Sequence, residues 1–410
     1  MLYPIGIQSF EKIRQGGYVY VDKTDLIYKI AKTGQYYFLS RPRRFGKSLL
    51  VSTMEAYFQG KKELFDGLAI ASLEKDWTEY PVLHFDLGGA SYADMDSLND
   101  KLGRQLKDLE SEYGVVRKYK TLPVRFETII EAAYRKTGRQ VVILVDEYDK
   151  PVIDNLDRPE LRDEIREELR GFYGVMKSND DIIRFGFLTG VTKIGKMSVF
   201  SDLNNLTDIS IDREYSDICG ISETDLNDCF AESVRELAEA NGLSEEECRQ
   251  KLALMYDGYH FHPKAAGIYN PFSLLSTFKA KEFKEYWFET GTPSFLVKVM
   301  RRTSYDVTRL SSDLVGSSLL TDVNTAFLNP VPLLYQSGYL TIKGFDPRFN
   351  LYTLGFPNME VKDGFLNFLL GYYAPIQSDS TNTLISLMSM DVESGNPEGF
   401  MTRLDALFAR

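Results

Sequence analysis

The tripeptide Gly46-Lys47-Ser48 has the residue types that bind the phosphates of a nucleotide. It lies between an apolar run at 35–40 and a helical pattern that starts at Lys47, so backbone N–H groups at the helix start can face an anion. Lys47 would reach the β- and γ-phosphates, Ser48 would bind Mg²⁺, and Gly46 would let the backbone approach closely. An ordinary helix start is the alternative, because the full GxxxxGK[ST] pattern has Arg41 in place of its first glycine.

Two adjacent carboxylates, Asp146 and Glu147, follow the continuously apolar run VVILV. Ligands of open α/β sheets bind at the carboxyl ends of the strands, where these side chains would lie. Asp146 would hold Mg²⁺ through its water shell, and Glu147 would orient and deprotonate the attacking water. A solvated turn is the alternative, and it is much less favoured in a chain that also carries Gly46-Lys47-Ser48.

Three further side chains are candidates for phosphate contact. Thr189 ends an apolar run at 183–189, and a polar residue on a strand between the other two would face the γ-phosphate. A Thr that caps its strand is an equally favoured reading. Arg43 and Arg44 lie in the loop itself, where they would neutralise phosphate charge or form a solvated basic turn.

Short β-rich runs alternate with amphipathic helices in the first half of the chain. This alternation predicts an α/β fold with a parallel sheet that helices cover on both faces. The predicted strands are 35–40, 82–87, 140–146, 183–189 and 207–211, and the predicted helices are 47–58, 95–113, 125–137 and 158–176.

The pattern changes at Ser222. Residues 222–256 predict two helices, each beginning at a Ser with acidic residues in its first turn, and we expect them to form a helical lid. Residues 287–373 combine helices with a hairpin of YLTIKG and FNLYTL, which indicates a winged-helix-like module. Its helix at 330–336 has no Lys or Arg, so we expect this helix to pack on the core rather than to read DNA.

The composition excludes several classes of protein. Lys and Arg total 48 against 59 Asp and Glu, a formal net charge of −11, so the chain is not globally attracted to nucleic acid. Three scattered cysteines form no disulfide framework or CxxC zinc pair, and only three histidines are present. No segment approaches the ~20 apolar residues of a spanning helix, and no signal peptide is visible. The expected location is therefore the cytoplasm, without a membrane partner.

Several segments, in this order along the chain, resemble the bacterial AAA-ATPase-like family: FEKIRQGGYVYVDKT, FLSRPRRFGKSLL, LVDEYDKPV, LTGVTK and YDGYHF. In this family the phosphate loop usually has Pro-Arg-Arg before Phe-Gly-Lys-Ser, which accounts for Arg41 in place of the first glycine. The resemblance implies a P-loop NTPase sheet of order 5-1-4-3-2, then a helical lid and a winged-helix-like domain, with ATP and Mg²⁺ as ligands. The expected site has ATP bound by Arg43, Arg44, Phe45, Gly46, Lys47, Ser48 and Leu49, metal held by Ser48 and Asp146, and catalysis by Glu147, Lys47 and Thr189.

The expected domains are an ATPase core at 1–220, a lid at 221–286, a winged-helix-like domain at 287–375, and a linker or the start of a further domain at 376–410. Members of the family commonly continue into a PD-(D/E)XK nuclease-like domain. Such a domain needs an acidic residue, then an Asp, then Glu-x-Lys at the end of an apolar strand. No residues after Pro375 form this set, so we expect no nuclease activity from them.

Three functions remain open at this point. The favoured one is Mg²⁺-dependent ATP binding and hydrolysis, acting as a switch for an attached effector of nuclease-like or other protein type. The second is a nucleotide-dependent module that binds protein or DNA with little turnover, and the third is a scaffold with an inactive loop. Self-association into a homo-oligomer is left open.

Overall fold

The computed structural model describes residues 1–116, 118–194, 205–289, 329–373 and 394–408. It also describes short stretches between these ranges, at 199–200, 203, 296, 299–300, 303, 305–306, 313–317, 320, 387–388 and 390–392. None of the helices in this part of the chain is long and apolar enough to cross a membrane.

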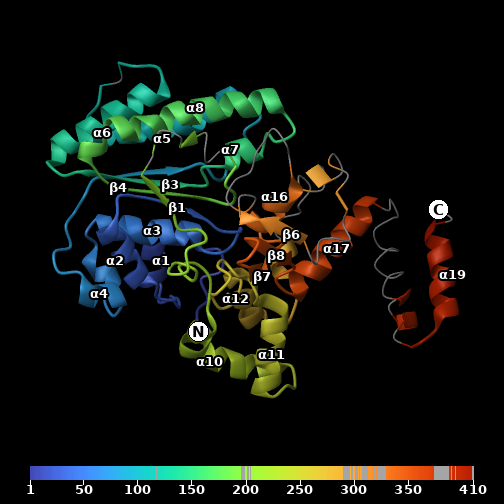
Figure 1. Cartoon of the computed structure of the whole chain (residues 1–410). Coiled ribbons are helices and arrows are strands. Elements are labelled where there is room, and N and C mark those ends of the chain that lie inside the picture. Colours follow the sequence, from blue (N-terminus) through green and yellow to red (C-terminus); the bar gives the residue numbers. More distant parts are fainter. Residues whose placement is uncertain are drawn as a thin grey trace.

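A five-stranded parallel sheet forms the centre of the first half of the chain (Figure 1). Its strands are β1 (Tyr36–Ser40), β2 (Val82–Asp86), β3 (Val141–Asp146), β4 (Ile183–Gly190) and β5 (Leu206–Asp208). The spatial order is β2-β3-β4-β1-β5, which is the expected order 5-1-4-3-2 read from the opposite edge. Because β1 and β3 run parallel on either side of β4, their carboxyl ends lie at the same edge of the sheet.

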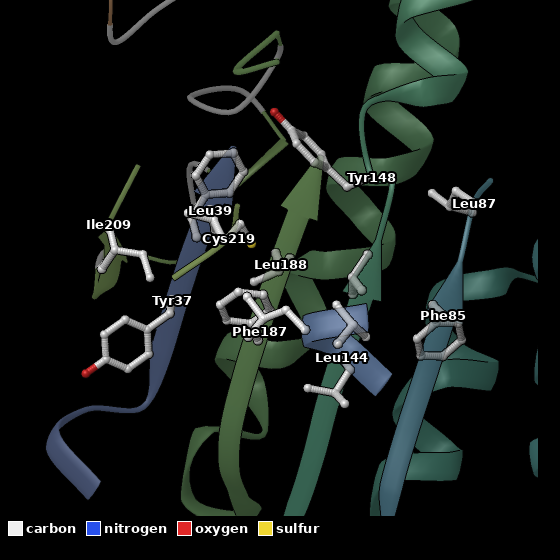
Figure 2. Packing of buried hydrophobic residues seen from close by; sticks show 14 of the residues in the cluster. Tyr37, Leu39, Phe85, Leu87, Leu144, Tyr148, Phe187, Leu188, Ile209 and Cys219 are labelled. Carbon is white, nitrogen blue, oxygen red and sulfur yellow. The ribbon is translucent and has the colours of Figure 1, made fainter. Parts of the chain in front are cut away.

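The central strands β1, β3 and β4 are buried on both faces, as their continuous apolar sequences predict. Every residue of β1 and of β3 is buried. Figure 2 shows how side chains from neighbouring strands, among them Tyr37, Phe187, Leu144 and Phe85, pack across the sheet. This packing gives the loops at the strand ends a rigid base.

Helices cover both faces of the sheet (Figure 1). One face carries α1 (Phe10–Gln15), α2 (Thr24–Thr33), α3 (Lys47–Phe58) and α4 (Ala69–Leu73). The other carries α5 (Met95–Tyr113), α6 (Leu122–Thr137) and α8 (Pro159–Ser178). Short 3-10 helices lie at Lys62–Phe65 and Asp180–Ile182. The helix α5 begins at an Asp94–Ser97 capping box and buries Leu98, Leu102 and Leu106, which recur every four residues on one face.

Beyond the sheet, three helices pack around a small apolar core of their own. They are α10 (Glu223–Ala240), α11 (Glu245–Tyr256) and α12 (Pro271–Ala280). Their shared core includes Leu226, Phe230, Leu252, Tyr256 and Leu274. Ser222 and Ser244 close capping boxes at the starts of α10 and α11, so the helix starts predicted from the sequence are confirmed.

The last part of the described chain combines an antiparallel sheet with helices. The sheet has the order β6-β8-β7, with β6 at Asp313–Gly316, β7 at Thr341–Asp346 and β8 at Leu351–Gly355. The hairpin of β7 and β8 was predicted, whereas β6 was not. The helices are α13 (Tyr286–Glu289), α16 (Pro330–Gln336), α17 (Met359–Tyr373) and α19 (Pro397–Phe408), and α19 lies apart from the others in Figure 1.

The helix α16 packs inward, as its lack of basic residues predicted. Leu333 and Leu334 have no exposed surface and Tyr335 is 9% exposed. Gln336 is also buried, and its amide oxygen accepts a hydrogen bond from the backbone N–H of Lys193 at 2.7 Å. Most of the interval 290–328 and all of 374–386 lie outside the described residues, so the expected module at 287–375 and the segment at 376–410 are described only in part.

Candidate functional site

The loop between β1 and α3 has the geometry of an anion site. Gly46 adopts a left-handed φ of 93° immediately before Lys47, the first residue of α3. A side chain there would meet no other atom within 4 Å, so glycine is needed for the backbone conformation rather than for space. This conformation turns the loop into the start of the helix, where unpaired backbone N–H groups can meet phosphate oxygens.

The ammonium of Lys47 lies folded into its own loop. Its Nζ donates to the carbonyl oxygens of Arg41 at 2.9 Å and Pro42 at 3.0 Å. Burial lowers the pKa of Lys47, and the charges of Asp146, Glu147 and Asp149 oppose this shift. The Lys47 side chain therefore lies near carboxylates and donates to carbonyl oxygens, which phosphate oxygens can replace as acceptors.

Arg41 is a structural residue of the loop. Its buried guanidinium donates to the backbone carbonyls of Ser40 at 2.9 Å, Ser210 at 2.8 Å and Tyr215 at 2.9 Å. It also lies 4.0 Å from the ring centroid of Phe261. The residue that replaces the first glycine of the usual pattern thus fastens the loop to the chain that follows β5, a role that sequence reasoning missed.

The two expected carboxylates lie at the carboxyl end of β3. Asp146 is 4% exposed, and burial raises its pKa while a hydrogen bond with Ser48 and the charge of Lys47 oppose the rise. Glu147 has a left-handed φ of 52°, and burial likewise raises its pKa against the charge of Lys47. A non-glycine residue in this conformation is uncommon and is often found at functional sites.

Asp149 is a third carboxylate that sequence reasoning did not select. It is 1% exposed and accepts hydrogen bonds from Val191 N at 3.2 Å, Thr192 N at 2.6 Å and Thr192 Oγ1 at 2.8 Å. Burial raises its pKa, and the hydrogen bonds from Thr192 oppose the rise. It joins the loop after β3 to the loop after β4, and its closeness to Asp146 in LVDEYDKPV was the available signal.

Lys47, Glu147 and Asp149 line a cavity of about 440 Å³. Its walls come from the N-terminal segment 4–8, the phosphate loop, the helix α7 (Lys150–Ile153) and the start of α12. Of the expected residues, the cavity is lined by Arg43, Arg44, Gly46, Lys47, Ser48, Leu49 and Glu147. Asp146 is not part of the cavity wall, but it precedes Glu147 in the chain and its pKa responds to Ser48 and Lys47, which are part of that wall.

Two expected residues lie elsewhere. Thr189 is fully buried and donates through its hydroxyl to the carbonyl oxygen of Leu39 at 2.7 Å, so the structure does not bring it to the cavity wall. Phe45 packs edge-on against Tyr259 at 4.8 Å and Phe261 at 5.5 Å between ring centroids. It lines a second, mostly apolar cavity of about 100 Å³, which shares Pro4, Gly46, Leu49, Pro271 and Leu275 with the first.

The donors present suit Mg²⁺ better than a transition metal. Ser48 and Asp146 offer a hydroxyl and a carboxylate, which are the oxygen ligands of hard cations. Among the residues that the structure describes, no group of three or more His, Cys, Asp or Glu is arranged to hold a metal by itself. A cation here would thus depend on phosphate oxygens and water for its remaining ligands.

Comparisons with known proteins relate this chain to a family and to a relative. A family model described as Predicted AAA-ATPase matches residues 4–200, the segment that contains the phosphate loop and the three carboxylates. The "Uncharacterized protein in vnfD 5'region" of Azotobacter chroococcum mcd 1 is 40% identical over 413 residues, which cover 99% of this chain and 77% of that protein. The similarity to this relative therefore continues well beyond residue 200.

Proposed function

The chain belongs to the AAA-ATPase-like family, and from this premise we propose that it binds and hydrolyses ATP with Mg²⁺. One observation carries the proposal: Lys47, Ser48 and Glu147 line a single cavity, and Ser48 and Lys47 are near enough to Asp146 to lower its pKa. These four residues come from the carboxyl ends of two strands of the sheet, where such folds bind ligands.

Binding of the phosphates begins in the loop before α3. The N–H groups around Gly46 and the first turn of α3 would hold the phosphate chain, and Lys47 would exchange two carbonyl acceptors for phosphate oxygens. Arg43 and Arg44 line the same cavity and would add positive charge. Ser48 and Asp146 would hold Mg²⁺, which when bound neutralises charge on the phosphates.

Glu147 is the proposed base. It faces the cavity, and its raised pKa favours the acceptance of a proton from an attacking water. Asp149 also lines the cavity, but its two oxygens accept hydrogen bonds from Val191 and Thr192 and hold the loop after β4 in place, so we assign it a positioning role. We assign no phosphate contact to Thr189, because its hydroxyl is bonded within the sheet.

The smaller cavity would hold the base of the nucleotide. It adjoins the larger cavity at Gly46 and is lined by apolar groups of Tyr20, Phe45, Ile221 and Phe230. Flat apolar walls suit a purine ring, which buries its faces and leaves its edges for hydrogen bonds.

The remaining architecture supports a switch. We propose 1–220 as the ATPase core, 221–286 as a lid over the nucleotide and 287–375 as a winged-helix-like domain, with 376–410 leading to an effector. The lid is supported by α12, whose Pro271, Phe272 and Leu275 form part of the cavity wall. A module that binds nucleotide but turns over little is the second candidate function, with protein or nucleic acid as partner.

Steady-state release of phosphate from ATP separates these two functions. Mg²⁺-dependent release by the wild-type protein supports hydrolysis, whereas tight ATP binding without release supports the binding module. A failure to bind ATP at all would contradict both.

A further inference from the structure

Glu360 is a buried carboxylate far along the chain from the phosphate loop. It lies at the start of α17 and has no exposed surface. The one hydroxyl hydrogen of Ser273 is shared between the two carboxylate oxygens of Glu360, with Oγ 3.0 Å from Oε1 and 2.8 Å from Oε2, and the backbone N–H of Trp287 donates to Oε1 at 2.7 Å. One side chain thus joins three helices, α12, α13 and α17.

The first partner, Trp287, reaches the phosphate loop. Its indole Nε1 donates to the carbonyl oxygen of Arg43 at 3.0 Å. Its ring is 5% exposed and packs against Tyr339 at 5.2 Å between ring centroids. Because Glu360 fixes the backbone from which this indole extends, the position of Trp287 against the loop depends on that carboxylate.

The second partner, Ser273, lies on the helix that forms the cavity wall. The neighbouring residues Pro271, Phe272 and Leu275 of α12 line the cavity. The guanidinium of Arg44 lies 5.0 Å from the ring centroid of Phe272. Through Ser273, Glu360 therefore also fixes a wall that contacts the loop at Arg44.

We propose that Glu360 is a positioning residue of the nucleotide site, holding Trp287 and α12 against the phosphate loop at Arg43 and Arg44. This inference rests on the proposed function, because it assigns to that site a residue outside the 4–200 segment that the family model matches. It also gives a physical route by which a nucleotide would be sensed at α17, since a shift of the loop carbonyl at Arg43 moves the acceptor of Trp287.

The chemistry of the contacts distinguishes two substitutions. Glu360→Ala leaves the N–H of Trp287 and the hydroxyl of Ser273 without their acceptor in a buried place. Glu360→Gln keeps an amide oxygen for the N–H of Trp287, and its NH₂ can donate to Ser273 Oγ. The conservative variant should therefore rescue the site, although it removes the charge.

Affinity for Mg²⁺–ADP, measured by isothermal titration calorimetry, is the direct test. We expect Glu360→Ala to weaken binding about tenfold, the equivalent of roughly one net hydrogen bond, and Glu360→Gln to stay within about twofold of wild type. Glu289→Gln is the matched control, because it removes an exposed carboxylate from the same helix as Trp287. If Glu360→Ala does not fold, Trp287→Phe replaces it, since it removes the indole N–H that contacts Arg43 while it keeps an aromatic ring, and it should weaken binding in the same direction.

Tryptophan fluorescence gives a second readout. The chain has two tryptophans, Trp77 and Trp287, so a Trp77→Phe background leaves Trp287 as the reporter. The indole N–H of Trp77 has no hydrogen-bond partner among the described residues, which makes that background a mild change. Addition of Mg²⁺–ADP should shift the emission of Trp287, and Glu360→Ala in this background should reduce the shift.

The outcomes distinguish a failure of the positioning role of Glu360 from a failure of the proposed function. If wild type binds nucleotide and Glu360→Ala or its substitute Trp287→Phe binds equally well, the positioning role is overturned and the proposed function stands. If Glu360→Gln is as weak as Glu360→Ala, the hydrogen-bond account is overturned. If wild type binds no nucleotide, the proposed function fails and this inference fails with it.

Discussion

The ammonium of Lys47 donates to the carbonyl oxygen of Arg41 at 2.9 Å, within the same loop. Arg41 in turn donates to the carbonyl of Tyr215 at 2.9 Å. The loop that accepts the hydrogen bond from Lys47 is therefore itself held by the chain that follows β5. The position of the Lys47 ammonium thus depends on a segment that Arg41 fixes to that part of the chain.

Replacement of Lys47 by Ala should remove nucleotide binding and leave the fold intact. The substitution deletes the charge that would meet the phosphates and two hydrogen bonds to loop carbonyls, whereas Arg41 still holds the loop to Ser210 and Tyr215. Calorimetric titration with ATP and far-UV circular dichroism measure the two parts. Lys62→Ala, at an exposed lysine, is the control and should bind as wild type does. Unchanged ATP affinity in Lys47→Ala would contradict the phosphate-loop assignment.

The Asp146→Asn variant should lose Mg²⁺-dependent turnover by at least about tenfold while ATP binding falls less. A neutral amide keeps the shape and the contact with Ser48 but is a poor partner for the metal and its water shell. Phosphate release across a Mg²⁺ titration is the measurement, with Asp96→Asn as an exposed control. A titration curve identical to that of wild type would rule out the metal role.

A side chain at Gly190 should destabilise the protein. A Cβ atom there would lie 2.3 Å from Asp149 Oδ1, so Gly190→Ala must displace the carboxylate that joins the loops after β3 and β4. We expect a loss of about 1–3 kcal/mol in the free energy of unfolding, measured by urea denaturation. Gly171→Ala lies within α8 with its nearest neighbour at 3.6 Å, and it should be neutral or stabilising by about 0.5–1 kcal/mol. Equal stabilities of the two variants would show that Asp149 does not occupy this position.

Glu360 should make stability depend on pH. Burial raises the pKa of Glu360 to about 7 from an ordinary value of 4.5, opposed by the hydrogen bonds from Trp287 and Ser273. A carboxyl group whose pKa is higher in the folded than in the unfolded state stabilises the fold in its protonated form. Its contribution to the free energy of unfolding is fully present below the ordinary pKa of 4.5 and is lost as the pH rises through 7. The loss is on the order of 3 kcal/mol, and Glu360→Gln should not show it. Urea unfolding at about pH 5 and about pH 8 tests this. The free energy of unfolding of Glu360→Gln should rise relative to that of wild type between the lower and the higher pH. A constant difference between the two proteins would contradict the prediction.

Local patterns were enough to predict much of the fold. The helices at Lys47–Phe58 and Met95–Tyr113 have the bounds that the sequence indicated, because local signals act within a few residues: a left-handed Gly46 before the first, and a capping box and Gly114 around the second. The loop and its carboxylates were found in the same way, since each follows a buried strand. The contacts of Arg41 with Tyr215, of Asp149 with Thr192 and of Glu360 with Trp287 were not found. They join residues tens of positions apart, and the position of β6 also depends on its partner strand rather than on its own sequence.

The most direct test of the account is phosphate release by the Glu147→Gln variant. The substitution keeps the size and shape of the side chain but replaces the basic carboxylate by a neutral amide. ATP binding should therefore persist while turnover falls about 100-fold or more. The measurement pairs calorimetric ATP affinity with steady-state phosphate release for wild type and variant at saturating Mg²⁺. Retained binding with lost turnover is the predicted result. Equal turnover in both proteins would contradict the proposal that this cavity hydrolyses ATP through Glu147.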